Sequence, residues 1–161
     1  IPVNIEKATM DGWELVVQHA FGESGFGIIA NATIVDADVG FDNLSLDQQF
    51  VLTGLSDSAN LIGYYENHGI GVRLAYNWRD DFLSGTGQPN VGAGPPYYTS
   101  DYEQWDLNAS YEFNDNLRMF LDVLNITGET AHTYGRSELQ TLLAIQQGPR
   151  YSVGFRYTFG P

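Results

Sequence analysis

Apolar and polar residues alternate along several stretches of this chain, and the alternation is its strongest structural signal. The segments 69–79, 104–113 and 150–159 each place five apolar or aromatic residues on one face and more polar residues on the other. A period of two over about ten residues predicts a β-strand whose two faces meet different environments. A tilted strand of about ten residues is also long enough to cross a bilayer.

Four weaker segments complete a set of seven predicted strands, at 12–21, 25–36, 59–66 and 117–126. The alternation in the last of them is imperfect, because Phe120 and Leu124 fall on its polar face. A β-bulge or a contact inside a barrel would each account for these two residues, and the sequence leaves both explanations open.

Short turns and long polar connections alternate along the chain. The long connections lie at about 37–58, 80–102 and 129–148 and are rich in Gly, Pro, Asn and Asp. This arrangement is typical of outer-membrane barrels, with tight turns on one side and long loops on the other. We therefore predict an all-β fold for residues 1–161 as a single segment. Its seven transmembrane-type strands form an antiparallel up-and-down meander, as part of a larger outer-membrane β-barrel or of a self-assembled β-structure.

One of the long connections carries a helix signal. Ser137 is a candidate N-cap with Gln140 three residues later, and Leu139, Leu142 and Leu143 have helical spacing. The pattern predicts a short loop helix of about two turns.

Aromatic residues gather near both ends of the predicted strands, as expected for aromatic girdles at two lipid–water interfaces. Those near the short turns are Phe21, Phe26, Tyr64, Tyr65, Tyr111, Phe113, Tyr157 and Phe159. Those near the long loops are Trp13, Tyr76, Trp78, Tyr102, Trp105 and Tyr151. A soluble β-sandwich with an aromatic core is the alternative, but it would not need its long loops on one side.

Composition narrows the classes of partner. The net charge of −13 argues against nucleic acid, whose phosphates an acidic surface repels. The absence of cysteine excludes disulfides and thiolate zinc sites. No apolar run approaches the ~20 residues of a membrane helix.

Candidate ligand-binding residues lie in the long loops. Tyr97, Tyr98 and Tyr134 could stack on sugar rings or pack within the loops. Asp36, Asp38 and Asp42 place carboxylates at intervals resembling a calcium loop, although a solvated acidic loop explains them better. We expect no cofactor apart from this candidate Ca²⁺.

Charged residues fall on the polar face of the predicted strands, where they would face a barrel lumen. An interior ladder of salt bridges, tying the wall to itself or to a plug, explains them better than substrate binding does. The lumen charges are Arg73, Arg79, Arg118, Arg150, Arg156, Asp106, Glu112 and Asp122. No nucleophile–base pair is present, so we expect the chain not to be an enzyme.

Several runs resemble the late barrel strands of TonB-dependent outer-membrane receptors, and they are most similar to the proteobacterial branch linked to carbohydrate uptake. These runs are 12–15, 54–56, 59–66, 73–79, 124–127 and 150–159. The resemblance implies that the chain is the C-terminal part of a barrel of twenty-two strands with an N-terminal plug. It also implies that Phe159 acts in the C-terminal assembly signal.

The resemblance implies a function as well. The parent protein would be a receptor of the bacterial outer membrane that imports a scarce ligand, such as an oligosaccharide or a chelate. Its partners would be outer-membrane lipid, the rest of the barrel, the plug, and TonB as the energy-coupling protein.

Seven strands raise an alternative function. Single-chain bacterial barrels have even strand numbers, and an open wall leaves two unpaired edges. Either further strands complete the barrel, or a released receptor fragment self-associates edge to edge into an extracellular filament or tube. In the second case we expect the strand at 150–159 to pair with the first long strand of another copy.

Overall fold

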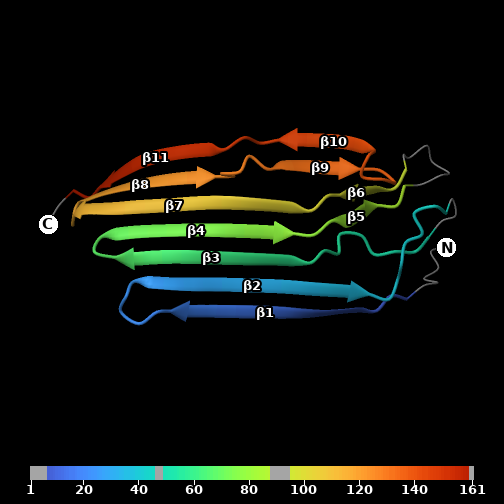
Figure 1. The fold of residues 1–161 in the computed structure, drawn as a ribbon, viewed down its shortest axis with the longest axis horizontal. Helices are drawn as coiled ribbons and strands as arrows, with labels where there is room; N and C mark the ends of the chain where they lie inside the picture. The colour runs from blue at the N-terminus through green and yellow to red at the C-terminus, as the bar shows by residue number, and fades with distance from the viewer. Residues whose placement is uncertain (1–6, 46–48, 88–94, 160–161) are drawn as a thin grey trace.

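A computed structural model describes residues 7–45, 49–87 and 95–159, and these residues form eleven β-strands in two sheets. The larger sheet has seven antiparallel strands in the order β1-β2-β3-β4-β7-β8-β11, which confirms the predicted meander (Figure 1). Its strands are β1 (Met10–Ala20), β2 (Phe26–Ala37), β3 (Ser58–Asn67), β4 (Ile70–Arg79), β7 (Tyr102–Asn114), β8 (Leu117–Leu124) and β11 (Arg150–Tyr157).

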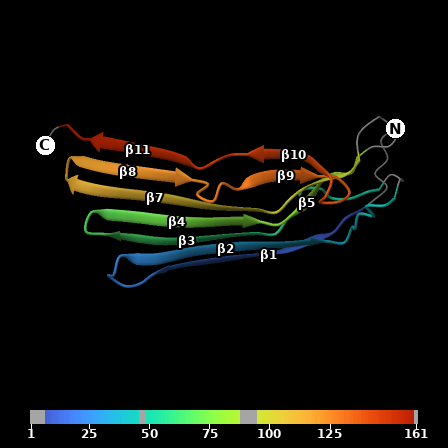
Figure 2. The same cartoon turned by 45° about the horizontal axis from the view of Figure 1, so that its top comes forward.

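All three tight turns lie at one end of the larger sheet, and the long connections lie at the other (Figures 1 and 2). The turn between β3 and β4 shows the local cause. Its two residues, His68 and Gly69, both have positive φ angles, of 53° and 73°. That backbone is typical of the two-residue turn whose twist matches a β-hairpin, and Gly69 adopts it without steric cost.

The register of the sheet separates an apolar face from a polar face. Leu107 lies opposite Leu74 on one side and Val123 on the other, while its neighbour Asn108 lies opposite Arg73 and Asp122. Because side chains alternate between faces, one consistent register across seven strands keeps every apolar row on the same side.

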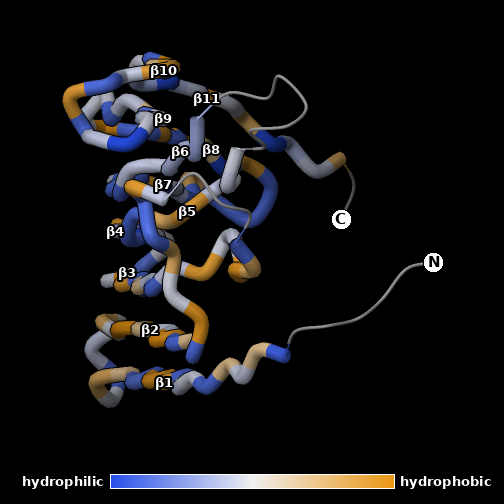
Figure 3. The backbone as a smooth tube through the Cα atoms, turned by 90° about the vertical axis from the view of Figure 1, so that its right-hand side faces the viewer, coloured by the Kyte–Doolittle hydropathy of each residue, from blue (hydrophilic) through white to orange (hydrophobic). Residues whose placement is uncertain are grey.

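The wall is a single curved layer of strands (Figure 3). Among the described residues, the only apolar side chains that are buried are Val123, Tyr134 and Pro96. Large apolar groups such as Trp13 and Phe155 are 74% and 66% exposed. A soluble sandwich would bury such groups between two sheets, so this apolar face needs an apolar surrounding.

The smaller sheet has the order β10-β9-β6-β5 and continues the larger one within the long connections. Strand β5 (Phe82–Gly85) follows β4, β6 (Tyr97–Thr99) precedes β7, β9 (Thr130–Tyr134) follows β8, and β10 (Thr141–Gln146) precedes β11. The wall strands β4, β7, β8 and β11 are thus each continued by a short strand of the smaller sheet, after a break of a few mostly polar residues. The long connections predicted at 80–102 and 129–148 therefore contain short strands that the sequence analysis did not indicate. Residues 46–48 and 88–94 of the long connections lie outside the described part.

The predicted helix near Ser137 is also wrong. The amide of Gln140 donates to the Ser137 carbonyl at 2.8 Å, so Ser137 begins a tight turn that leads into β10. Leu139 is 97% exposed, so the helical spacing of leucines has no apolar surface to cover. Pairing with β9 satisfies the backbone of β10, whereas an isolated two-turn helix is marginal in water. No helix in the described ranges is long and apolar enough to span a membrane.

Phe120 lies on the polar face without a bulge at its position. It pairs directly with Gly154 of β11, and a Cβ added at Gly154 would overlap the phenyl ring. Tyr64 covers its partner Gly27 in the same way. Tyr64 therefore belongs to the polar face, and so does Tyr102, the partner of Arg79, which corrects their assignment to the lipid-facing girdles.

Eight of the other girdle residues form four ring pairs, which lie near the two ends of the wall. Centroids lie 4.7–4.8 Å apart in each pair. The pairs at the tight-turn end are Phe26–Tyr65, Tyr111–Phe113 and Tyr157–Phe159, and the pair at the long-connection end is Tyr76–Trp105.

Candidate functional site

Three connections far apart in the sequence meet at the outer end of the wall. A residue after β2, a residue of β6, and the end of β9 with the turn that follows it together line a groove of about 410 Å³. We call it the outer groove. Its lining residues are Asn43, Tyr98, Tyr134, Arg136, Ser137, Glu138 and Leu139.

Tyr98 and Tyr134 are direct partners across β6 and β9, and their rings are stacked. The ring centroids lie 5.2 Å apart and the ring planes differ by 8°. Tyr134 is buried at 9% exposure, whereas Tyr98 is half-buried. Tyr98 is therefore the ring that a bound molecule can reach, and Tyr134 supports it from behind.

Asp81 fixes the orientation of Tyr134. The phenol of Tyr134 donates a hydrogen bond to Asp81 Oδ2 at 2.5 Å. Burial of the ring, together with this bond to a carboxylate, holds the pKa of Tyr134 well above its usual range. Burial and the nearby charge of Asp81 also raise the pKa of Tyr98. Both phenols are therefore protonated, uncharged donors at neutral pH.

A clasp between Asn43 and Arg136 closes one side of the groove. The Asn43 side-chain amide donates to the Arg136 carbonyl at 2.7 Å, and the Arg136 guanidinium donates to the Asn43 carbonyl. These residues are 93 positions apart, and the clasp holds the connection after β2 against the β9–β10 turn. The Oδ1 atom of Asn43 is buried and has no hydrogen-bond partner in the described part of the chain.

Of the three tyrosines predicted to bind a ligand, the structure brings two together. Tyr97 is the neighbour of Tyr98 in β6, so its side chain falls on the opposite face. It pairs with Gly85 of β5, where an added Cβ would lie 2.5 Å from the Tyr97 ring. Tyr97 thus packs over a glycine outside the outer groove.

A second hollow, of about 320 Å³, adjoins the outer groove and shares Tyr134 and Glu138 with it. We call it the acidic recess. Its other lining residues are Asp80, Asp81, Ser100 and Asp101, which lie at the breaks between the two sheets. The sequence analysis missed it because Asp80-Asp81 and Asp101 approach each other only through the pairing of β4 with β7.

The predicted calcium ligands do not gather. Asp36 pairs with Asp11 in the sheet, Asp38 accepts a hydrogen bond from the Thr9 amide at 2.7 Å, and Asp42 accepts one from the Leu44 amide at 2.9 Å. No cluster of three or more potential metal-ligating side chains occurs among the residues that the structure describes. The calcium site stays a prediction.

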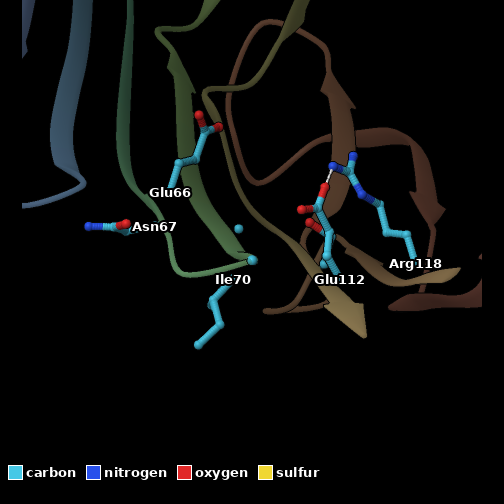
Figure 4. Close-up of a pocket in the computed structure, with 8 residues that line it drawn as sticks. Glu66, Asn67, Ile70, Glu112 and Arg118 are labelled. Carbon is cyan, nitrogen blue, oxygen red and sulfur yellow. Dashed lines mark ion pairs between the residues drawn. The ribbon is translucent and has the colours of Figure 1, made fainter. Parts of the chain in front are cut away.

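The predicted lumen charges fall on the polar face of the wall, but they do not form a ladder of salt bridges. Across the described ranges, the only ion pair joins Arg118 to Glu112, beside a polar recess at the tight-turn end (Figure 4). Asp106 and Asp122 instead accept hydrogen bonds from the amides of Gln104 and Asn108.

The arginines on this face have varied neighbours. Arg156 lies opposite Arg118, Arg73 opposite Asn108, and Arg150 opposite Leu124. Arg79 donates to the Ser100 carbonyl at 3.3 Å and lies over the ring of Phe82. Whether any of them contacts a plug stays a prediction.

Asn125 is a structural centre that the sequence analysis did not single out for this role. It is 4% exposed and has a positive φ of 55°. Its side chain exchanges hydrogen bonds with the backbone of Glu129 and also donates to the Gln147 carbonyl, while its own amide donates to Asp106. It therefore joins the β8–β9 turn, the β10–β11 connection and β7. Asn adopts a positive φ more readily than most residues. An Asn directly after an apolar strand segment was therefore the signal that the sequence offered.

Phe159 follows β11 and is 88% exposed, with its ring against Tyr157. The neighbouring amide of Thr158 still donates to the Asn116 carbonyl at 2.9 Å, so the pairing with β8 extends to this point. The role of Phe159 in barrel assembly stays a prediction.

Comparison with known proteins gives one match. A family model described as "TonB dependent receptor-like, beta-barrel" matches residues 1–126. No curated protein and no solved structure matches the chain significantly.

Proposed function

The chain belongs to the family of TonB-dependent receptor-like β-barrels, and we propose that it forms part of the wall and outer gate of a transporter for a scarce ligand. The family is one of outer-membrane receptors and transporters rather than of enzymes. Membership therefore gives the chain three kinds of partner: lipid, the rest of the receptor, and TonB. We propose in addition that the imported ligand is an oligosaccharide or a chelate.

One observation carries this function: the two faces of the wall differ along its whole width. Apolar side chains from all seven strands lie on one face in continuous register, and amides and charges lie on the other. A lipid-facing surface and a hydrated lumen require these two faces. The outer groove lies at the end with the long connections, where a ligand would arrive from outside.

Uptake by cells tests the proposal. Cells that carry the receptor are given labelled neutral oligosaccharides and ferric chelates, with and without a functional TonB. We expect at least one of these ligands to accumulate only when both the receptor and TonB are present. Equal accumulation in cells lacking TonB would contradict the proposal.

Edge-to-edge assembly is the second candidate function, and the two edges of the wall support it. All side chains of β1 are exposed, and Val153 and Phe155 of β11 are more than 60% exposed. Unpaired strand edges invite pairing with another chain. Assembly of this kind would make the chain a structural protein.

Strand direction limits how copies can pair. Seven antiparallel strands make β1 and β11 run the same way, so copies in one orientation could join β11 to β1 only in parallel. Antiparallel pairing with matched faces instead joins β11 to β11. With Gly154 at the two-fold axis, Val153 lies opposite Phe155, and Tyr151 lies opposite Tyr157.

Proline substitutions separate this pairing from the fold of the wall. The Thr158 amide points toward β8, so alternate N–H groups, including those of Val153 and Phe155, point to the free edge. Val153→Pro should therefore block assembly and leave the β8 pairing intact, whereas Ser152→Pro, the matched control, should disrupt the wall itself.

Light scattering and electron microscopy of the 161-residue chain without detergent give the measurement. Assembly of the unsubstituted chain and its loss in Val153→Pro would support this second function. A stable monomer at micromolar concentration would exclude it.

A further inference from the structure

We propose that β1 is a second self-pairing edge of the wall, where two copies of the chain join β1 to β1 in antiparallel register with Leu15 on the two-fold axis. This inference rests on the edge-to-edge assembly proposed above as the second function, and it names the contact through which such an assembly can grow. Pairing of β11 with β11 joins two copies and then stops, because both have used that edge. A filament or tube therefore needs a further contact, and β1 is the other edge of the larger sheet.

The backbone of β1 directs a row of hydrogen-bonding groups away from the sheet. The Phe21 amide donates to the Phe26 carbonyl, and the Asp38 amide donates to the Thr9 carbonyl. Odd-numbered residues of β1 therefore bond to β2, and the even-numbered residues from 10 to 20 point their N–H and C=O groups outward. The strand contains no Pro, no Lys and no bulge, which are the features that block pairing at natural edges.

The outward groups limit the register that two copies can adopt. Even-numbered positions must lie opposite even-numbered positions for these groups to bond and for the faces of the two sheets to match. A two-fold axis at Leu15 satisfies this condition and overlaps all 11 residues of β1, with Met10 opposite Ala20. An axis at Glu14 would also satisfy it, but this carboxylate would then lie directly opposite its own copy and repel it.

The side chains of β1 are complementary in this register. Leu15 meets Leu15 of the second copy, and Trp13 meets Val17, so side chains that are 54–74% exposed in the single wall cover one another. Asp11 lies opposite His19 at both ends of the paired strands. Odd-numbered positions form the closely spaced, non-hydrogen-bonded pairs of the new ladder, so the carboxylate can accept a hydrogen bond from the imidazole N–H.

The pairing also relieves an unfavourable contact within each copy. Asp11 lies opposite Asp36 of β2, and like charges that face each other across two strands are destabilising. His19 lies opposite Ile28, and its ring contacts Phe21 at a centroid distance of 4.8 Å. Each copy thus carries an acid and a base at opposite ends of one edge. Two-fold pairing about Leu15 brings them together twice.

Cysteine crosslinking of the 161-residue chain without detergent tests the register, because the natural chain contains no cysteine. In Leu15→Cys the thiol lies on the two-fold axis, where the α-carbons of a non-hydrogen-bonded pair are close enough for a disulfide. We expect mild oxidation to convert most Leu15→Cys chains into covalent dimers.

Val17→Cys is the matched control, because it lies on the same face and is similarly exposed. Its α-carbon would be more than about 13 Å from its counterpart, since the two are offset by four residues. Val17→Cys should therefore crosslink at least about tenfold more slowly, because a disulfide cannot span that separation.

The charged pair gives a second readout in the Leu15→Cys chain. His19→Asp should slow crosslinking about fivefold, because Asp11 then faces a like charge. Exchanging the two residues, as Asp11→His with His19→Asp, should recover the original rate. This recovery would show that the loss in His19→Asp is not a failure to fold.

Three results would overturn the proposal: equal crosslinking at positions 15 and 17, an unchanged rate in His19→Asp, or assembly seen by light scattering without any Leu15→Cys dimer. The third result would refute this contact and leave edge-to-edge assembly through β11 in place. Leu15→Cys dimers that persist in Val153→Pro would support a contact independent of β11. A stable monomer of the unsubstituted chain would refute the edge-to-edge function itself, and the β1 contact with it.

Discussion

The phenyl ring of Phe120 covers the α-carbon of Gly154, its direct partner on the neighbouring strand. The same relationship joins Tyr64 to Gly27 in the wall and Tyr97 to Gly85 in the outer sheet. In each pair an aromatic ring takes the space that a glycine leaves open. A glycine in a strand lacks side-chain packing, and a cross-strand aromatic ring replaces it.

Adding a methyl group at Gly154 should therefore destabilise the wall. We expect Gly154→Ala to cost about 1–3 kcal/mol, because the Phe120 ring must move out of its position. Gly63→Ala is the matched control, since a Cβ at Gly63 meets no atom within 4 Å. Urea unfolding of the protein in lipid measures both, and equal effects would show that the Phe120–Gly154 pair is not special. In a double-mutant cycle, Phe120→Ala should remove the penalty of Gly154→Ala.

The two faces of β7 should respond differently to a charge. Leu107→Arg places a cation among Leu74 and Val123 on the lipid face and should cost about 2–4 kcal/mol near the bilayer midplane. Asn108→Arg faces the lumen beside Asp122 and should be tolerated better. Folding titrations into lipid vesicles give the two free energies. Equal losses would contradict the assignment of the faces.

Asn125 should hold the outer sheet to the wall. Asn125→Ala removes three side-chain hydrogen bonds and should cost about 1–3 kcal/mol for the buried groups left unsatisfied. Asn125→Gly adopts the positive φ at no steric cost. It therefore distinguishes the effect of the lost side-chain hydrogen bonds from the effect of backbone strain.

Trypsin gives the readout for Asn125, because Arg136 is the only Lys or Arg between Arg118 and Arg150. Both Asn125 variants should be cut faster at Arg136 than the unsubstituted protein. If Asn125→Gly were cut at the original rate, the side chain would have no role in holding the outer sheet.

The outer sheet should loosen in alkali. The folded-state pKa of Tyr134 lies above its unfolded value of about 10. Above that value the unfolded state binds fewer protons than the folded state, so stability falls as pH rises. The stabilisation is fully present below about pH 10. Tyr134→Phe should flatten this dependence, with tyrosinate absorbance and trypsin cleavage at Arg136 as measurements. An unchanged alkaline profile in this variant would assign the transition to another group.

The alternation of residues by itself determined the seven strands of the wall, their antiparallel order and the end at which each connection lies. It could do so because successive residues of a strand point to opposite faces, and a membrane wall has lipid on one face and water on the other. Position in the long connections, rather than the alternation, made Tyr97, Tyr98 and Tyr134 candidate ligand contacts. The prediction of a helix at Ser137 was wrong because local capping and spacing signals contain no information about the partner strand β9.

Tertiary structure alone decided which polar and aromatic groups meet. Phe120 on a polar face was ambiguous until Gly154 lay opposite it, and the Asn43–Arg136 clasp joins residues that no periodic pattern connects. Tyr97 and Tyr98 are neighbours of identical type, and only the strand pairing of β6 sends one to a glycine and the other to the outer groove. These relationships depend on cross-strand register and on contacts between distant connections at the outer end. The whole sheet sets both, rather than any local run of residues.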